Sequence, residues 1–447
     1  MRRVVAPNSA ASPGDEDRSS SSWRRDLLGS AIAKAGFLIP TALVAFWALR
    51  SVSEGFGLTG LAVYSIVASI PTLLPFSDLG MGGTLTQFVA NHPNDRHQIV
   101  RAYQSITIRV AIIAAFILVA ALLLYATDTW PMILGIGDHN ASAAATMVVI
   151  LFAIGMPLSL GYRVLLGVQR NSMVVLLQSV SGVLGSSLVV ILTMVDAPLP
   201  IVASAPMFAG TVFSMLGTLI CVRALPAKAE GSGDSDWHFD GSVALAFLVT
   251  AVSAPITFQI DRILLGNLST ASQLADYTAV FQIYGPANAL VIAAGQALWP
   301  RFSALRRGRG DALAKSFLSN TALFASAGAM IGVGLVVLSP IIAQWSTAGL
   351  ADPSLDLRIF FALLITLNAT LYPAGMFMVG GAAVRIQATC ALITAIVKIV
   401  LAVTVFSTLG AAGMVASTLI AVFIFTGLPL SIYMTTYLVR RRKSPQT

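Results

Sequence analysis

Twelve long apolar runs constrain this chain more than any other feature of its sequence. A helix needs ~20 apolar residues to cross the ~30 Å hydrocarbon core of a bilayer, and each run has about that length. The sequence therefore predicts an all-α integral membrane protein with about 12 transmembrane helices. The runs cover 27–49, 56–78, 106–126, 143–163, 173–195, 201–222, 243–265, 276–298, 316–338, 358–379, 386–407 and 412–438.

The charge content agrees with a surface that is covered by lipid. Charged residues make up 10% of the 447 residues and hydrophobic residues 56%, whereas a soluble domain carries about 25% charged residues. A net charge of +8 in a soluble protein would suggest nucleic acid as a partner. Here the charges lie mostly in short segments between the apolar runs, so membrane topology explains them and no nucleic acid is expected.

Lysine and arginine placement predicts the orientation of the helices. Cytosolic loops of membrane proteins are enriched in these residues. With the N-terminus in the cytosol, 22 of the 27 Lys and Arg residues fall on the cytosolic side, and only Arg50 and Arg358 fall outside. One missed span would reverse every later loop, so this bias supports the helix count. The expected protein is a multi-pass component of the inner (plasma) membrane with both termini in the cytosol.

The spans divide evenly around a polar segment at 223–242. This segment contains Pro226, Gly231 and Gly233 and is typical of a flexible linker. The expected organisation is a disordered cytosolic tail at 1–26, a six-helix bundle at 27–222, the cytosolic linker at 223–242, a second six-helix bundle at 243–439 and a basic cytosolic tail at 440–447. Two parallel halves of six helices are a recurring plan of membrane transporters.

Lys398 is the most unusual ionisable residue within a predicted span. Such a residue costs roughly 2.5–3.5 kcal/mol on insertion scales and so indicates a functional site. Lys398 lies about 18 Å of helical rise from either end of its run, which is too far for its stem to reach water easily. We expect it to face a cavity and attract an anionic group. The alternative is a structural ion pair within one bundle.

Asp261, Arg262 and Lys34 are further ionisable candidates within the predicted spans. Asp261 and Arg262 are consecutive, so on a helix they point about 100° apart and cannot pair with each other. We expect Arg262 to face the cavity and Asp261 to be buried, with ordinary interface packing as the alternative. Lys34 lies about two turns into the first run, where it could line the cavity or reach the cytosolic interface.

Several other residues are candidates for the cavity or for a hinge. Arg109 lies at a cytosolic helix end, as a topology anchor or at the cavity mouth. Gln259, Gln282 and Asn288 could line the cavity or hydrogen-bond between helices. Asp78 and Gly80 are expected to form a cap or hinge at the end of the second run. Elsewhere, Gly328 and Gly332 form a GxxxG pair that predicts close helix packing.

Short motifs give the chain a resemblance to a known family. They are Glu54-Gly55-Phe56-Gly57-Leu58, Asp78-Leu79-Gly80-Met81-Gly82-Gly83-Thr84-Leu85 with Gln87-Phe88-Val89-Ala90, Asp261-Arg262-Ile263-Leu264-Leu265-Gly266 and Asp276-Tyr277-Thr278-Ala279. With the twelve-span pattern, they resemble the polysaccharide-transport branch of the MOP exporter superfamily, the O-antigen and exopolysaccharide flippases. The resemblance implies a MATE-like pair of bundles around a central cavity.

Signs of enzymatic chemistry are missing from the sequence. There is no G-x-x-x-x-G-K-[ST] run for nucleotide binding, no G-x-S-x-G and no cluster with metal-ligand spacing. Cys221 and Cys390 lie far apart at predicted helix ends, so we expect neither a disulfide nor a zinc site. The chain is not expected to be an enzyme or to hold a cofactor. A coupling ion, H⁺ or Na⁺, is left open.

Three functions remain open at this stage. The resemblance implies a flippase that moves a polyprenyl-diphosphate-linked oligosaccharide by alternating access, with membrane lipids and other polysaccharide-assembly proteins as further partners. A MATE-type multidrug or cation antiporter would need a carboxylate site, for which Asp261 and Asp78 are the candidates. A membrane glycan polymerase or ligase would need catalytic groups in a large outer loop, and the outer loops here are short.

Overall fold

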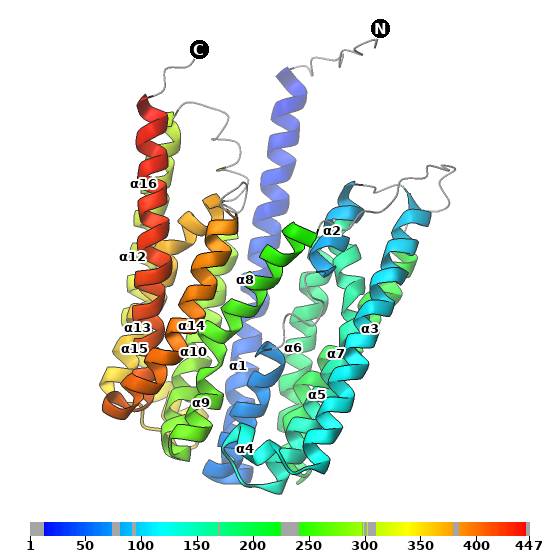
Figure 1. Ribbon diagram of the computed structural model, residues 1–447, viewed down its shortest axis with the longest axis vertical. Coiled ribbons are helices and arrows are strands. Elements are labelled where there is room, and N and C mark those ends of the chain that lie inside the picture. Colours follow the sequence, from blue (N-terminus) through cyan, green and yellow to red (C-terminus); the bar gives the residue numbers. More distant parts are fainter. Residues whose placement is uncertain are drawn as a thin grey trace.

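The protein is built from long α-helices in the computed structural model, which describes residues 13–73, 81–91, 95–168, 170–224, 241–296, 310–378 and 384–443, together with residues 298 and 302. The helices run nearly parallel along one long axis (Figure 1). They are α1 (Pro13–Leu73), α2 (Met81–Asn91), α3 (Arg96–Ala126), α4 (Trp130–Leu134), α5 (His139–Gly167), α6 (Asn171–Met194), α7 (Leu199–Ala224), α8 (Gly241–Gln259), α9 (Asp261–Leu268), α10 (Ala271–Gln296), α12 (Gly310–Ser346), α13 (Leu355–Met378), α14 (Val384–Leu409), α15 (Ala411–Ala421), the π-helical η2 (Val422–Gly427) and α16 (Leu428–Lys443).

Helices long and apolar enough to span a bilayer dominate the described part of the chain. Ten helices meet this description, and the bent pair α8 and α9 would make an eleventh. The expected all-helical membrane fold is therefore confirmed, while the count of twelve spans stays a prediction. Two short helices, α2 and α4, and the π-helical turn η2 were not expected, because each is shorter than a membrane-crossing run.

Gly57 divides α1 into two helical segments. Its backbone has φ 64° and ψ −162°, a conformation that is non-helical and that side chains with a Cβ rarely adopt. The expected runs at 27–49 and 56–78 thus begin as separate segments of α1 on either side of this break. The second run ends beyond Leu73, in residues outside the described part. Asp78 and Gly80, the expected cap or hinge, also lie outside it.

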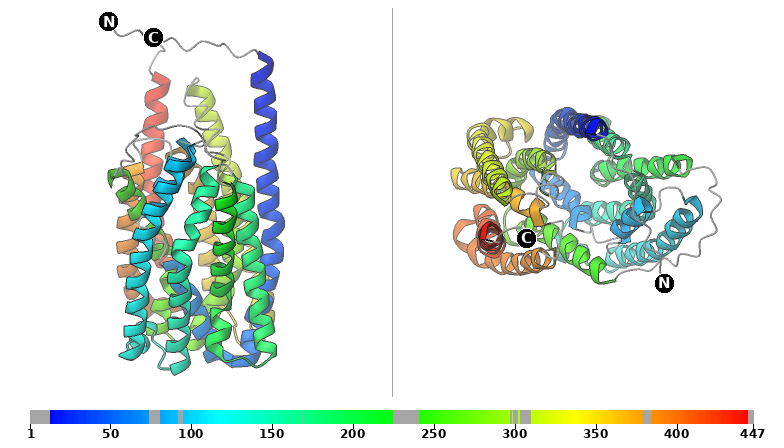
Figure 2. Two further views of the ribbon diagram at one scale, coloured as in Figure 1. Left: turned by 90° about the vertical axis from the view of Figure 1, so that its right-hand side faces the viewer. Right: turned by 90° about the horizontal axis from the view of Figure 1, so that it is seen from above.

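The helices before residue 224 and those after residue 241 form two groups that lie side by side (Figures 1 and 2). Helix α1 begins and α16 ends at the same end of the molecule, which we call the terminal end. The opposite end, where α4 and α9 lie, is the distal end. Helix α1 contacts α8, α9, α10 and α12, so α1 is a central element between the two groups.

Small residues allow close packing within each group. A Cβ added to Gly328 would meet Ala369, and one added to Gly332 would meet the Ala362 carbonyl, so both glycines of α12 lie against α13. This confirms the prediction made from the GxxxG pair. In the first group, Gly161 of α5 lies in the same way against Thr218 of α7. Such contacts bring the helix backbones close together. In a bilayer the hydrophobic effect does not drive helices together, so close van der Waals packing holds them.

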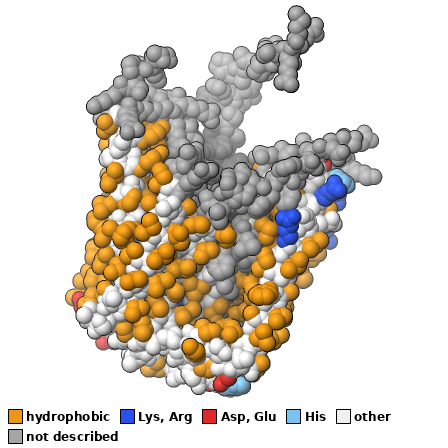
Figure 3. Space-filling view, viewed as in Figure 1, with side chains coloured by type: hydrophobic (Ala, Val, Ile, Leu, Met, Phe, Trp, Pro, Cys, Tyr) orange, Lys and Arg blue, Asp and Glu red, His pale blue; other side chains and the backbone are white. Residues whose placement is uncertain are grey.

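The outer wall carries the apolar surface that lipid requires. Phe116, Met330 and Ile341 are 78%, 76% and 68% exposed, although each is a large apolar residue. Figure 3 shows hydrophobic side chains covering the visible wall between the two ends, with Lys and Arg towards the terminal end and acidic side chains mainly along the distal edge. A surface of this kind is expected in a bilayer and not in water.

Several contacts between the two groups lie at the distal end, and we call them the distal seam. The backbones of Gly135, after α4, and Gly266, in α9, touch without room for a side chain. The Asn267 side-chain amide donates a hydrogen bond to the Ile133 carbonyl (2.9 Å). At another point, the Arg50 guanidinium donates to the Trp345 carbonyl (3.0 Å) and lies over the Trp345 ring.

Replacing Gly266 by alanine is expected to destabilise this closed seam by about 1–3 kcal/mol, because the new Cβ would overlap the Leu134 carbonyl oxygen and the Ile66 side chain. The melting temperature of the purified protein measures the effect. Gly285→Ala is the matched control, since nothing lies within 4 Å of its Cβ position. Equal melting temperatures for the two variants would show that the seam has room and is not the close contact described.

Candidate functional site

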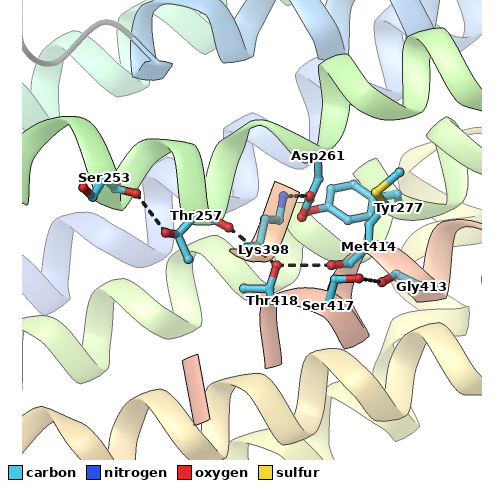
Figure 4. Close-up of polar contacts among 9 residues, drawn as sticks. All are labelled: Ser253, Thr257, Asp261, Tyr277, Lys398, Gly413, Met414, Ser417 and Thr418. Atoms are coloured by element: carbon cyan, nitrogen blue, oxygen red, sulfur yellow. Dashed lines mark hydrogen bonds and ion pairs between the residues drawn. The ribbon is translucent and has the colours of Figure 1, made fainter. Parts of the chain in front are cut away.

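Lys398 lies in the middle of α14 and is completely buried, at 0% exposure. Its ammonium group forms an ion pair with the Oδ1 atom of Asp261, the first residue of α9. Figure 4 shows the lysine side chain reaching from α14 directly to this carboxylate. In this conformation Lys398 thus forms the structural ion pair that the sequence left open as the alternative, and its role in a cavity stays a prediction. The reason is physical, because a buried ammonium without water needs a counter-charge and Asp261 supplies one.

Asp261, on α9, is held by side chains of two other helices. Its Oδ2 atom accepts a hydrogen bond from the Tyr277 hydroxyl of α10 (2.9 Å), while Oδ1 faces Lys398 (Figure 4). Asp261 is 2% exposed, as expected from the sequence. It also lies in the first turn of α9, where a negative charge is favoured by the helix dipole. Each carboxylate oxygen thus has a donor, which is what a buried carboxylate requires.

The bend between α8 and α9 places this carboxylate. The two helices meet at an angle of 43° around Ile260. Pro255, one turn earlier in α8, removes a backbone donor and weakens the helix before the bend. Helix α15 closes the region from the other side, where the Thr418 hydroxyl donates to the Thr257 carbonyl of α8 (3.5 Å; Figure 4).

Arg262 has neighbours other than those of Asp261 and contacts the other group of helices. Its guanidinium lies over the Phe281 ring, 4.3 Å from the ring centre, and Nη1 donates a long hydrogen bond of 3.5 Å to the Ser65 carbonyl of α1. The Ser65 hydroxyl in turn lies 2.5 Å from the Thr278 hydroxyl of α10. The expectation that Asp261 and Arg262 have separate partners is confirmed. Arg262 occupies the inner part of the distal seam.

The three charges do not cancel. Arg262 is 8% exposed, and its Nε atom is buried without a hydrogen-bond partner. Among the residues that the structure describes, Lys398 has Asp261 as its ion-pair partner, and no carboxylate forms an ion pair with Arg262. Two cations against one carboxylate give this buried cluster a net charge of +1. We call Asp261, Arg262, Tyr277 and Lys398 the seam cluster.

The remaining candidates do not belong to the seam cluster. Gln259 ends α8, and Gln282 and Asn288 lie along α10; all three are half-buried. Arg109 is exposed on α3. Lys34 lies in α1, within a stretch whose side chains are outside the described part. Their roles as cavity residues remain predictions.

Sequence reasoning missed the partners of the charged residues. Tyr277, Ser65 and Thr278 were not chosen, although Tyr277 and Thr278 belong to one of the motifs that carry the family resemblance. One signal was present, because a buried lysine and a buried aspartate in the same half of the chain favour each other as partners. A hydroxyl carries no comparable signal, since most hydroxyls in membrane helices bond to their own backbone.

Two cavities lie between the helix groups. One, of about 330 Å³, is lined by residues of α1, α6 and α10. Its walls are mostly apolar, with Thr41, Gln178 and Ser179 as the polar exceptions. The second, of about 270 Å³, lies in the distal seam and is bordered by residues such as Ala62, Gly135 and Gly266. Both lie where α1 meets helices of the second group.

Solved structures with the same arrangement define the class of protein. A multidrug resistance MATE family transporter of the MOP superfamily, in an inward-facing conformation, superposes with a TM-score of 0.63, with 13% identity over 93% of this chain and 100% of that chain. The lipid II flippase MurJ, in an inward closed conformation, gives a TM-score of 0.64 with 14% identity over 92% of this chain and 90% of that one. This protein is a multi-pass helical membrane protein with the MOP fold.

Sequence comparison identifies the family of this protein. Residues 52–306, more than half of the chain, match the family described as Polysaccharide biosynthesis protein, and the chain belongs to that family. A Shigella flexneri protein that carries the provisional name of O-antigen transporter is 22% identical over 280 residues, which cover 61% of this chain and 65% of the relative. The chain thus matches just under two thirds of that relative's length. The resemblance seen in the short motifs is confirmed at the level of the family and the fold.

Proposed function

We propose that this protein translocates a polyprenyl-diphosphate-linked oligosaccharide across the inner membrane for cell-surface polysaccharide assembly. The observation that carries the proposal is the net charge of +1 on the buried seam cluster. An uncompensated cation is costly in an apolar environment and favours an anionic ligand. Family membership and the distant relationship to the Shigella flexneri protein support a glycan cargo.

Arg262 is the cation that we assign to the head group. Lys398 is already neutralised by Asp261, so its contribution is indirect: without it, the Asp261 carboxylate would cancel the charge of Arg262. A guanidinium also offers several donors in a planar fork that suits phosphate oxygens. This assignment differs from the sequence-based one, in which Lys398 was the first contact.

The proposed movement is alternating access between twelve spans arranged as two six-helix bundles, with both termini in the cytosol. The distal end then faces outwards, and the distal seam closes the outer side in this structure. The apolar walls of the cavity between α1, α6 and α10 suit the lipid tail of the carrier, which stays in the bilayer while the head group crosses. Excess Lys and Arg towards the terminal end support this orientation (Figure 3).

Deletion of the gene in its own cell tests the cargo. The expected result is loss of one surface glycan, together with accumulation of the corresponding diphosphate-linked oligosaccharide that can be extracted with the membrane lipids. Return of the wild-type gene should restore the glycan, and the Arg262→Met variant, whose seam cluster has no net charge, should not. An unchanged glycan with new sensitivity to cationic drugs would instead establish a multidrug antiporter.

A further inference from the structure

The distal seam has one feature that close packing alone would not produce. Its inner part encloses Arg262, which is buried without an ion-pair partner among the described residues and has an unsatisfied Nε atom. The other contacts across the seam are neutral or are satisfied close to the surface, such as the Asn267 amide on the Ile133 carbonyl. The closed seam therefore encloses a charge that water would solvate if the seam opened.

The partners of Arg262 show which state its charge favours. Phe281, which lies under the guanidinium, is on α10 in the same helix group, so this contact can persist when the two groups separate. Among the described residues, Arg262 makes one hydrogen bond across the seam, at 3.5 Å, to the Ser65 carbonyl. A bond of that length contributes little, whereas an uncompensated buried charge is strongly destabilising. The cost of burial outweighs the gain from the contact.

We propose that Arg262 is an opening charge: its buried charge favours the opening of the distal seam, which acts as the distal gate. Its buried charge raises the free energy of the closed seam, so that the closed and open states of the distal end stay close enough in energy to interconvert without nucleotide hydrolysis in this chain. The gate itself consists of the neutral contacts around it: Gly135 against Gly266, Ser65 with Thr278, and Asn267 with the Ile133 carbonyl. Arg262 thus acts in the closed state by opposing closure.

The inference rests on the alternating access of the proposed function, but it does not depend on the cargo. It concerns the equilibrium of the empty protein, so it can be measured without any substrate. A population shift between two states requires a difference in free energy between them, and removal of a buried charge provides such a difference. The neutral variant should therefore be more closed at its distal end than the wild-type protein.

A cysteine in the distal cavity reports the opening. Ala62 is 2% exposed and lines that cavity, so Ala62→Cys adds a thiol that reagents reach only when the seam opens. Cys221 and Cys390 are first replaced by alanine. The purified protein in detergent is then treated with a charged methanethiosulfonate reagent, and the modification rate of the new thiol is followed by mass spectrometry in three proteins: the parent, Arg262→Met and Arg262→Lys.

The thiol of the Arg262→Met variant is expected to react at about one tenth of the parent's rate or below, because loss of the buried charge favours closure. Arg262→Lys keeps the charge and should react at a rate close to that of the parent. Arg101→Met, which removes an exposed arginine of α3, should change nothing. Melting curves identify any variant that fails to fold.

An unchanged or faster rate in a folded Arg262→Met protein would overturn the inference, since Arg262 would then be neutral or would hold the gate closed. This result would leave the proposed cargo intact. Conversely, a slower rate together with a normal surface glycan in cells that carry Arg262→Met would support the opening charge and contradict the head-group assignment.

Discussion

Asp261→Asn and Lys398→Met are each expected to destabilise the folded protein by about 3–5 kcal/mol, because each leaves the other residue as a buried charge that has lost its direct ion-pair partner. The double variant should recover most of this loss, since it removes both charges and keeps two side chains of similar size. Melting temperatures of the four proteins in one detergent give the coupling energy. A coupling within about 0.5 kcal/mol of zero would mean that the two residues do not interact.

The same four proteins separate two roles of Lys398 in transport. The wild-type seam cluster and the double variant both have a net charge of +1, carried in the double variant by Arg262 alone. Lys398→Met alone has no net charge. If Lys398 acts by neutralising Asp261, the double variant should transport far better than Lys398→Met. A stable double variant that is as inactive as Lys398→Met would show that the ammonium contacts the cargo directly, as the sequence first indicated.

A disulfide across the distal seam is expected to stop transport completely and reversibly. The Ser65 and Thr278 hydroxyl oxygens lie 2.5 Å apart and belong to different helix groups. Ser65→Cys with Thr278→Cys, in a chain with Cys221→Ala and Cys390→Ala, should therefore form a disulfide on oxidation. The closed seam would then be fixed, and reduction should restore the transport rate. Alkylation of the remaining thiols with a polyethylene glycol maleimide measures the fraction that is cross-linked.

The chain provides a matched control for this cross-link. The Thr394 and Thr426 hydroxyls lie 2.8 Å apart, but both belong to the second group, on α14 and η2. A disulfide between cysteines at these two positions should leave the seam free to open and should preserve transport. Full transport by the oxidised Ser65→Cys/Thr278→Cys protein, with the cross-link verified, would mean that this seam does not open during the cycle.

Much of the fold could be predicted because lipid imposes a simple rule on sequence. Backbone groups in a bilayer must bond within their own segment, so every long apolar run becomes a helix. The ends were harder to predict. Helix α3 begins at Arg96 and α12 at Gly310, before the apolar runs at 106 and 316, because a helix can continue into polar residues where water is present. The π-helical turn η2 lies within an apolar run and leaves no trace in hydropathy, whereas the bend at Ile260 lies between Pro255 and the charged Asp261.

The site could be predicted in part. Residues Lys398, Asp261 and Arg262 could be chosen, because charges inside apolar runs are costly and few. Which of them would meet depends on helix packing. The ion pair joins residues 137 positions apart, and the Arg262 contact with Ser65 spans 197 positions. No local pattern encodes such distances. The structure therefore changes the assignment of the uncompensated charge from Lys398 to Arg262.

Translocation in proteoliposomes tests the central claim most directly. The purified protein is reconstituted with a polyprenyl-diphosphate-linked oligosaccharide of its own cell, and periodate outside the vesicles oxidises only sugars that reach the outer leaflet. With the wild-type protein, the whole pool of sugar should become oxidised. With the oxidised Ser65→Cys/Thr278→Cys protein, only the initial outer-leaflet fraction should react. The contradicting result would be that the wild-type protein also exposes no more than that fraction. If the Ala62→Cys reporter shows that the seam opens under the same conditions, the protein would then not be a flippase for this lipid.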